Sequence, residues 1–211
     1  MYRIFVFVLI STLLSEHVNG KTGDQKPTTI PLDQIWGYNM PGTRNVSALD
    51  AAKELTGVKA HPIVRQIVSS LASRHPKEGE NVESAFIVPG SGRKALENAN
   101  AVLTNAVEPA KAFSPDTDLT LVFYSAIGGG YVRIASVEKS NHTITVKYRF
   151  KSHNTRDDSL HFALIPLGQL PEDRYKVKIE QIGSIDAKGK PSEPIARFER
   201  VVCRDTSFVI R

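Results

Sequence analysis

The spacing of hydrophobic residues changes near Leu119, from a helical period of about 3.6 residues to a strand period of about 2. The clearest stretch is 143–150, where an apolar residue stands at every second position. Such alternation is typical of a strand that buries one face. Six more segments have strand character: residues 119–127, 131–138, 160–167, 175–182, 195–203 and 207–210. This succession of short strands predicts a β-sandwich.

Helical periodicity is found before this change. Three segments are predicted to be helices: residues 48–56, 62–74 and 93–107. A short strand is predicted at residues 85–88. We therefore expect an α+β protein, in which a small helical N-terminal half is followed by an antiparallel immunoglobulin-like β-sandwich.

One tyrosine supports the immunoglobulin-like prediction. Tyr175 opens a strand directly after Leu170 and a tight polar turn. This is the arrangement of a tyrosine corner, in which the phenol hydroxyl bonds to the backbone a few residues upstream. Such a corner fixes a loop, so we expect Tyr175 to serve stability.

The first twenty residues have the pattern of a cleavable secretory signal peptide. Arg3 supplies the positive start, residues 4–14 the apolar segment and Gly20 a small residue for cleavage. The apolar segment is too short to cross a bilayer comfortably, which makes an uncleaved anchor the less favoured alternative. The expected organisation is signal peptide 1–20, flexible leader 21–30, helical α/β region 31–113 and β-sandwich domain 114–211. We expect a secreted or periplasmic protein with no transmembrane span in its mature form.

The positive charge of the chain is interpreted first as a contribution to solubility, and the footprint of an anionic partner is the alternative. The formal net charge is +5 and the isoelectric point is near 9.3. An exported basic protein meets polysaccharides and other cell-envelope material, and no basic run with interleaved aromatic residues indicates nucleic acid. Cys203 is the single cysteine, so it forms no disulfide within the chain. It is predicted to be a buried residue of a late strand, with an intermolecular bridge or a catalytic thiol as alternatives.

A glycine-containing turn precedes the predicted helix 93–107. Gly90, Gly92 and Ala95 match the spacing G-x-G-x-x-A, and Arg93 and Lys94 lie within it. Three interpretations are open: a dinucleotide-binding turn, a simple anion site that uses Arg93 and Lys94, and a plain turn that starts a helix. The plain turn is favoured, because antiparallel rather than βαβ sequence follows. No cofactor is predicted.

Basic residues also alternate along two predicted strands. Lys147, Arg149 and Lys151 share one face of their strand, and Lys176 and Lys178 share one face of theirs. If these strands are neighbours, the residues form a basic sheet face. The favoured interpretation of such a face is a solvated surface that also discourages edge pairing, and an anion-binding surface is the alternative.

A polar cluster between two predicted strands supplies the candidates for catalysis. His153, Asp157 and His161 stand close together in the sequence, and Arg44 could join them where the two halves of the chain meet. Their spacing matches no metal-ligand signature, so no metal site is predicted. An ordinary polar loop explains the same residues.

Five segments, taken together, resemble a family of secreted bacterial proteins of the planctomycete type: residues 35–44, 121–124, 148–150, 161–168 and 201–204. The resemblance covers most of the chain after the signal peptide. It implies export and a bacterial source, and it implies no activity and no functional residue.

These observations favour a binding or structural module outside the cytoplasm. Its predicted partner is anionic polysaccharide or cell-envelope material. A secreted hydrolase, with its site at the junction of the two halves, is the alternative.

Overall fold

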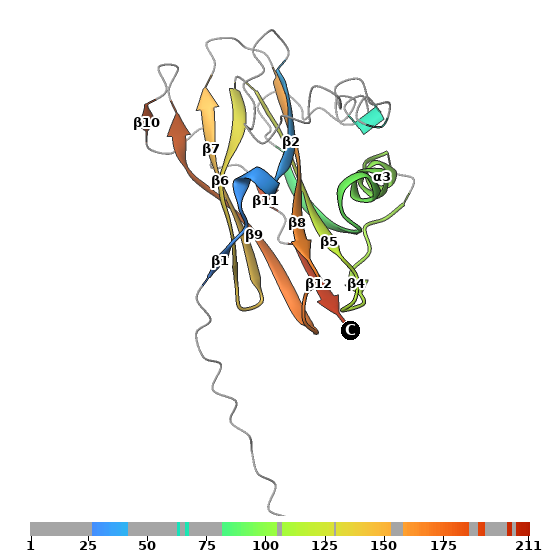
Figure 1. Ribbon diagram of the computed structural model, residues 1–211. Coiled ribbons are helices and arrows are strands. Elements are labelled where there is room, and N and C mark those ends of the chain that lie inside the picture. The colour runs from blue at the N-terminus through green and yellow to red at the C-terminus, as the bar shows by residue number, and fades with distance from the viewer. Residues whose placement is uncertain are drawn as a thin grey trace, which may run out of the picture.

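The computed structural model describes residues 27–41, 63, 66–67, 82–104, 107–128, 130–152, 158–185, 190–192, 202–203 and 206–211. Two β-sheets dominate these residues, and a helix packs on the outside of one sheet (Figure 1). The seven-stranded sheet is called sheet A, and the five-stranded one is called sheet B. The described part of the chain therefore has three layers.

Sheet A is built around the long hairpin of β6 and β7. Its strand order is β1-β6-β7-β9-β12-β4, and β10 pairs with β9. The strands are β1 (Thr28–Thr29), β4 (Ala112–Phe113), β6 (Gly130–Ser140), β7 (Thr143–Ser152), β9 (Asp173–Ile185), β10 (Pro191–Ser192) and β12 (Thr206–Ile210).

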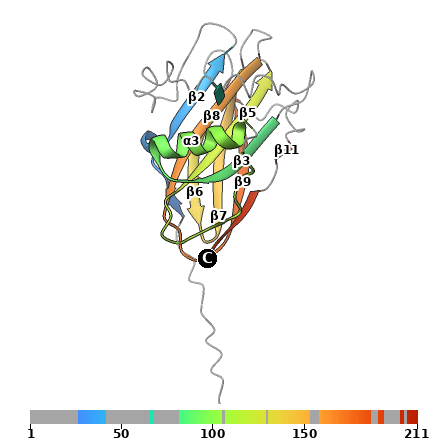
Figure 2. The ribbon, with the colours of Figure 1, turned by 90° about the vertical axis from the view of Figure 1, so that its right-hand side faces the viewer.

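Sheet B has the order β11-β3-β5-β8-β2. Its strands are β2 (Trp36–Pro41), β3 (Val82–Pro89), β5 (Leu119–Gly128), β8 (Asp158–Gly168) and β11 (Val202–Cys203). The described helices are α3 (Gly92–Leu103) and the short 3-10 helix η1 (Leu32–Gln34). Helix α3 lies across the face of sheet B that points away from sheet A (Figure 2).

Within the described residues, sheet B is covered on both faces and sheet A on one. Phe123 of β5 belongs to the core between the sheets, whereas its neighbour Val122 packs beneath α3. The central strands of sheet B therefore carry unbroken apolar runs, such as residues 85–88. Strand β7 has only one buried face, which explains its strict alternation.

The structure overturns the predicted fold class. The N-terminal part contributes strands β2 and β3 to sheet B, so it is not a helical half. Parallel pairs join β7 to β9, β12 to β4 and β11 to β3, and they are absent from the predicted antiparallel sandwich. Strand β2 escaped prediction because Gly37, Asn39 and Pro41 are turn-type residues, and its pairing with β8 is a long-range contact.

Several local predictions are confirmed. The strand at 143–150 lies within β7, and the strand at 85–88 lies within β3. The predicted helix 93–107 corresponds to α3, although α3 ends at Leu103. Residues 63, 66 and 67 of the predicted helix 62–74 are helical, and Ile67 is buried in the hydrophobic cluster between α3 and sheet B. The predicted helix 48–56 lies outside the described residues.

Tyr175 makes the hydrogen bond of a tyrosine corner, although the surrounding sandwich is not immunoglobulin-like. Its hydroxyl donates to the carbonyl oxygen of Pro171 over 3.1 Å. Its ring is buried and stacks on Phe208, with ring centroids 5.4 Å apart. Burial raises the pKa of the phenol, and the charge of Asp173 adds to the rise. The hydroxyl thus remains a donor at physiological pH.

Removal of this hydroxyl is expected to weaken the fold. Tyr175→Phe should lower the free energy of unfolding by about 1 kcal/mol, because the ring is kept while the Pro171 carbonyl loses its donor. Urea denaturation measures the effect. Tyr124→Phe is the matched control, since the Tyr124 ring is half-buried against Phe86. Equal losses in the two variants would contradict a specific role for the corner bond.

Candidate functional site

The two strands with alternating basic residues are neighbours in sheet A, so the condition for a shared basic face is met. Strand β7 pairs in parallel with β9, so that Thr145 lies opposite Lys178 and Lys147 lies opposite Glu180. The side chains between the buried positions point away from sheet B. We call the following outward residues the basic face: Arg133, Glu138, Lys147, Arg149, Arg174, Lys176, Lys178 and Glu180. Lys151 also lies in β7, but its side chain is outside the described part.

Two ion pairs lie on the basic face. The Lys147 ammonium bonds both carboxylate oxygens of Glu138, at 2.9 and 2.8 Å, and Lys178 pairs with Glu180. The bond from Lys147 lowers the pKa of Glu138; desolvation opposes this effect, and a bond from Ser136 assists it. Six basic and two acidic residues give the described basic face a formal charge of 6 − 2 = +4. The two glutamates therefore leave the face strongly positive.

Two arginines meet at one end of this face. Arg133 of β6 and Arg149 of β7 occupy directly opposite positions of the hairpin. Like charges in such positions repel each other. Their neighbours in register include Lys147 and the bulge of β9 that contains Ile182, which is 41% exposed.

Sequence reasoning missed Arg133 because of a β-bulge. The turn at residues 141–142 pairs Ser140 with Thr143, and continued regular pairing would place Ile134 opposite Arg149. The register shifts between Ile134 and Ser136, which brings Arg133 opposite Arg149 and leaves Ile134 in the core. The sequence signal for this bulge is the apolar side chain of Ile134, because regular pairing would place it on the outward face beside charged residues.

The glycine turn before α3 is held by hydrogen bonds to residues at the start of β5. Gly90 and Gly92 have φ values of 91° and 52°, which favour glycine. The Gly90 amide donates to the carbonyl of Asp118 over 2.7 Å, and its carbonyl accepts a bond from Thr120 at 2.7 Å. The dinucleotide interpretation is wrong, because β3 and β5 are antiparallel and form no βαβ unit.

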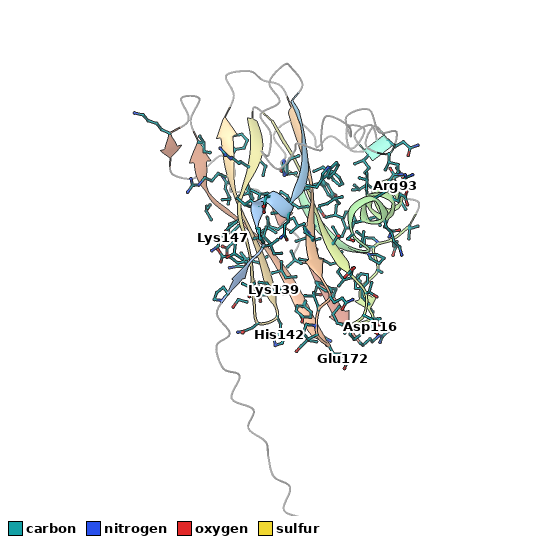
Figure 3. All side chains as sticks on the ribbon, in the orientation of Figure 1. Arg93, Asp116, Lys139, His142, Lys147 and Glu172 are labelled. Carbon is teal, nitrogen blue, oxygen red and sulfur yellow. The ribbon has the colours of Figure 1, made fainter. Side chains whose placement is uncertain are left out.

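The predicted anion-binding residues do not converge. Arg93 forms an exposed i,i+4 pair with Glu97 at 2.9 Å, and Lys94 is exposed on the same helix. Figure 3 shows Arg93 on α3 and Lys147 on β7, at opposite sides of the molecule. Lys147 and Arg149 therefore belong to the basic face, whereas Arg93 and Lys94 do not.

The predicted catalytic residues are not brought together by the described part of the chain. His161 lies inside β8, is 1% exposed and contacts the ring of Phe123, with centroids 5.6 Å apart. Burial lowers its pKa to about 3, so the imidazole is neutral at pH 7. Arg44, His153 and Asp157 lie outside the described residues. No group of three or more His, Cys, Asp or Glu side chains within the described residues could hold a metal ion.

Comparison of the chain with family models, with curated proteins and with solved structures finds no match. The resemblance to secreted planctomycete-type proteins thus stays a prediction. Among the described helices, none is both long and apolar enough to cross a membrane.

Proposed function

We propose that this protein is an exported, non-catalytic binding module that holds anionic polysaccharide or cell-envelope material on its basic face. The observation that carries the proposal is the pairing of β7 with β9. This pairing joins two rows of basic residues into one face, and the β6 hairpin adds Arg133 to it.

The layout of the face suits an extended polymer. Residues on one side of a strand repeat about every 7 Å, and neighbouring strands lie about 5 Å apart. Arg174, Lys176 and Lys178 thus form a row along β9, and Lys147 and Arg149 continue the basic face further along the neighbouring strand β7, beside Glu180 and the bulge of β9. A linear polymer with regularly spaced sulfate or carboxylate groups can contact several of these cations at once. Arginine binds such groups through two parallel hydrogen bonds.

The charge of the basic face is the reason for proposing an anionic partner, and the position of His161 is the reason for proposing no catalytic role. A field of one sign attracts polyanions and weakens as salt screens it. The catalytic candidate with a described side chain, His161, lies in the core between the sheets rather than on this face. The signal peptide pattern of residues 1–20 is the basis for proposing export.

A charge-matched pair of variants tests the proposal. Arg133→Gln/Arg149→Gln removes two charges from the basic face, and Arg93→Gln/Lys94→Gln removes two from α3 on the opposite side. Binding to dextran sulfate is measured at low salt, with neutral dextran as the reference polymer. We expect the first variant to bind about tenfold more weakly or worse, because a basic residue at an anionic surface contributes about 1 kcal/mol.

The α3 variant should retain affinity within about threefold of the unaltered protein, since its charges lie away from the proposed surface. Binding of the unaltered protein should weaken steadily as salt is raised toward about 1 M, where the Debye length is only about 3 Å. Equal losses in both variants would mean that overall charge, and not this face, determines binding. Equal binding to neutral dextran would also contradict the proposal.

A further inference from the structure

The core between the two sheets becomes more polar toward the C-terminal end of β7, at the top of Figure 1. Below this level the core is apolar and aromatic. At this level three polar side chains are each only 1% exposed: Ser125 on β5, His161 on β8 and Ser184 on β9. Two come from sheet B and one from sheet A.

The three residues lie at the same height of the sandwich. Ser125 is directly opposite His161 within sheet B, and Ser184 is directly opposite Phe150 within sheet A. One step lower, the Phe123 ring contacts both His161 and Tyr148 of sheet A, with centroids 5.6 and 6.0 Å away. Since Tyr148 and Phe150 are successive inward residues of β7, the serines of the two sheets face the same layer.

The buried hydroxyl groups of this layer lack a hydrogen-bond partner among the described residues. Within the described part of the chain, the Oγ atoms of Ser125 and Ser184 are buried and make no hydrogen bond with protein. The same holds for Nε2 of Gln181, which lies opposite Tyr148 just below. A buried hydroxyl without a partner costs about 1–3 kcal/mol, and folded proteins satisfy nearly all such groups.

The local backbone adds polar groups at the same height. The register between β7 and β9 shifts between Tyr148 and Phe150, so that Ile182 and Gly183 together oppose Arg149. A bulge of this kind leaves backbone groups of the extra residue outside the ladder. A buried water molecule usually has two to four polar partners, and it both donates and accepts hydrogen bonds.

We propose that the layer of Ser125, Gln181 and Ser184 is a binding site for internal water, which bridges sheet A and sheet B. Water fits the observations because it is a small molecule that both donates and accepts hydrogen bonds, and because the surrounding rings of Phe123, Tyr148 and Phe150 are themselves buried. The site is independent of the basic face, whose side chains point to the other side of sheet A.

Substitution of the two serines tests the bridge. Ser125→Ala and Ser184→Ala should each raise the unfolding equilibrium constant by about five- to tenfold, because each removes a satisfied buried hydrogen bond. If one water network joins the two hydroxyls, the increase in the unfolding equilibrium constant of the double variant should be smaller, by at least about threefold, than the product of the two single increases. The control is Ser207→Ala, an exposed position of β12 that should change little.

Each alternative result has a defined meaning. An unchanged or more stable single variant would show that the hydroxyl has no partner, and strictly multiplicative effects would exclude a shared bridge; both overturn the proposal. In the unaltered protein, nuclear Overhauser contacts are expected between long-lived water and the amide protons of Ser125 and Ser184, and their absence would also overturn it. A small organic molecule retained in native mass spectrometry would replace water as the occupant and refute our assignment.

Discussion

Phe123→Ala is expected to lower the free energy of unfolding by about 3–5 kcal/mol. Phe123 is fully buried on the central strand of sheet B. Its ring contacts Tyr148 of the facing sheet and His161 of the neighbouring strand, with centroids 6.0 and 5.6 Å away. Truncation removes the apolar burial and leaves a cavity where the two sheets meet. Such a cavity is costly because the surrounding strands relax only in part.

Equilibrium denaturation with guanidinium chloride measures this effect. Phe123→Leu retains most of the volume and should lose only about 1 kcal/mol. Thr145→Ala, a half-buried outward position of β7, serves as the control and should change little. A loss below about 1 kcal/mol for Phe123→Ala would show that this ring does not hold the sheets together.

His161 is expected to make the protein lose about 2 kcal/mol of folding free energy between pH 7 and pH 5. Burial lowers the pKa of its imidazole from 6.5 to about 3 in the folded protein. Below pH 6.5 the unfolded chain therefore binds a proton that the folded protein refuses. Stability is complete above this range and falls by about 1.4 kcal/mol per pH unit toward the folded pKa.

The experiment compares His161→Gln with a control variant. His161→Gln should abolish the loss between pH 7 and pH 5, whereas Ser207→Ala, at an exposed position of β12, should keep it. The pKa of Glu138 is lowered from 4.5, so this carboxylate titrates below the chosen window. An unaltered acid slope in His161→Gln would contradict the assignment, as would proton titration of the His161 ring by NMR above pH 5.

Local features of the structure could be predicted from the residues alone. The alternation of 143–150 identifies the buried face of β7, because the side chains of a strand point to opposite sides in turn. The apolar stripe of 93–107 identifies α3, and the residues before Tyr175 identify its corner bond. In each case the interacting groups are only a few residues apart, so a short window of sequence contains the physical cause.

Only part of the candidate site could be predicted from the sequence. Lys147 and Arg149 could be assigned to one strand face, but their union with Lys176 and Lys178 depended on which strands pair. Arg133 required the bulge near Ile134 as well. His161 was placed in a loop cluster, whereas the burial that makes it neutral comes from the packing of two sheets.

Sequence periodicity by itself determined that segments such as 143–150 are strands, that 93–103 is a helix, and which of their faces are buried. Tertiary structure alone decided that β2 joins β8, that β7 runs parallel to β9, and that α3 covers sheet B. The physical reason is that strand pairing joins residues far apart in the chain through the same backbone hydrogen bonds, whatever the side chains. Which pairs form is then decided by how much apolar surface the whole arrangement removes from water.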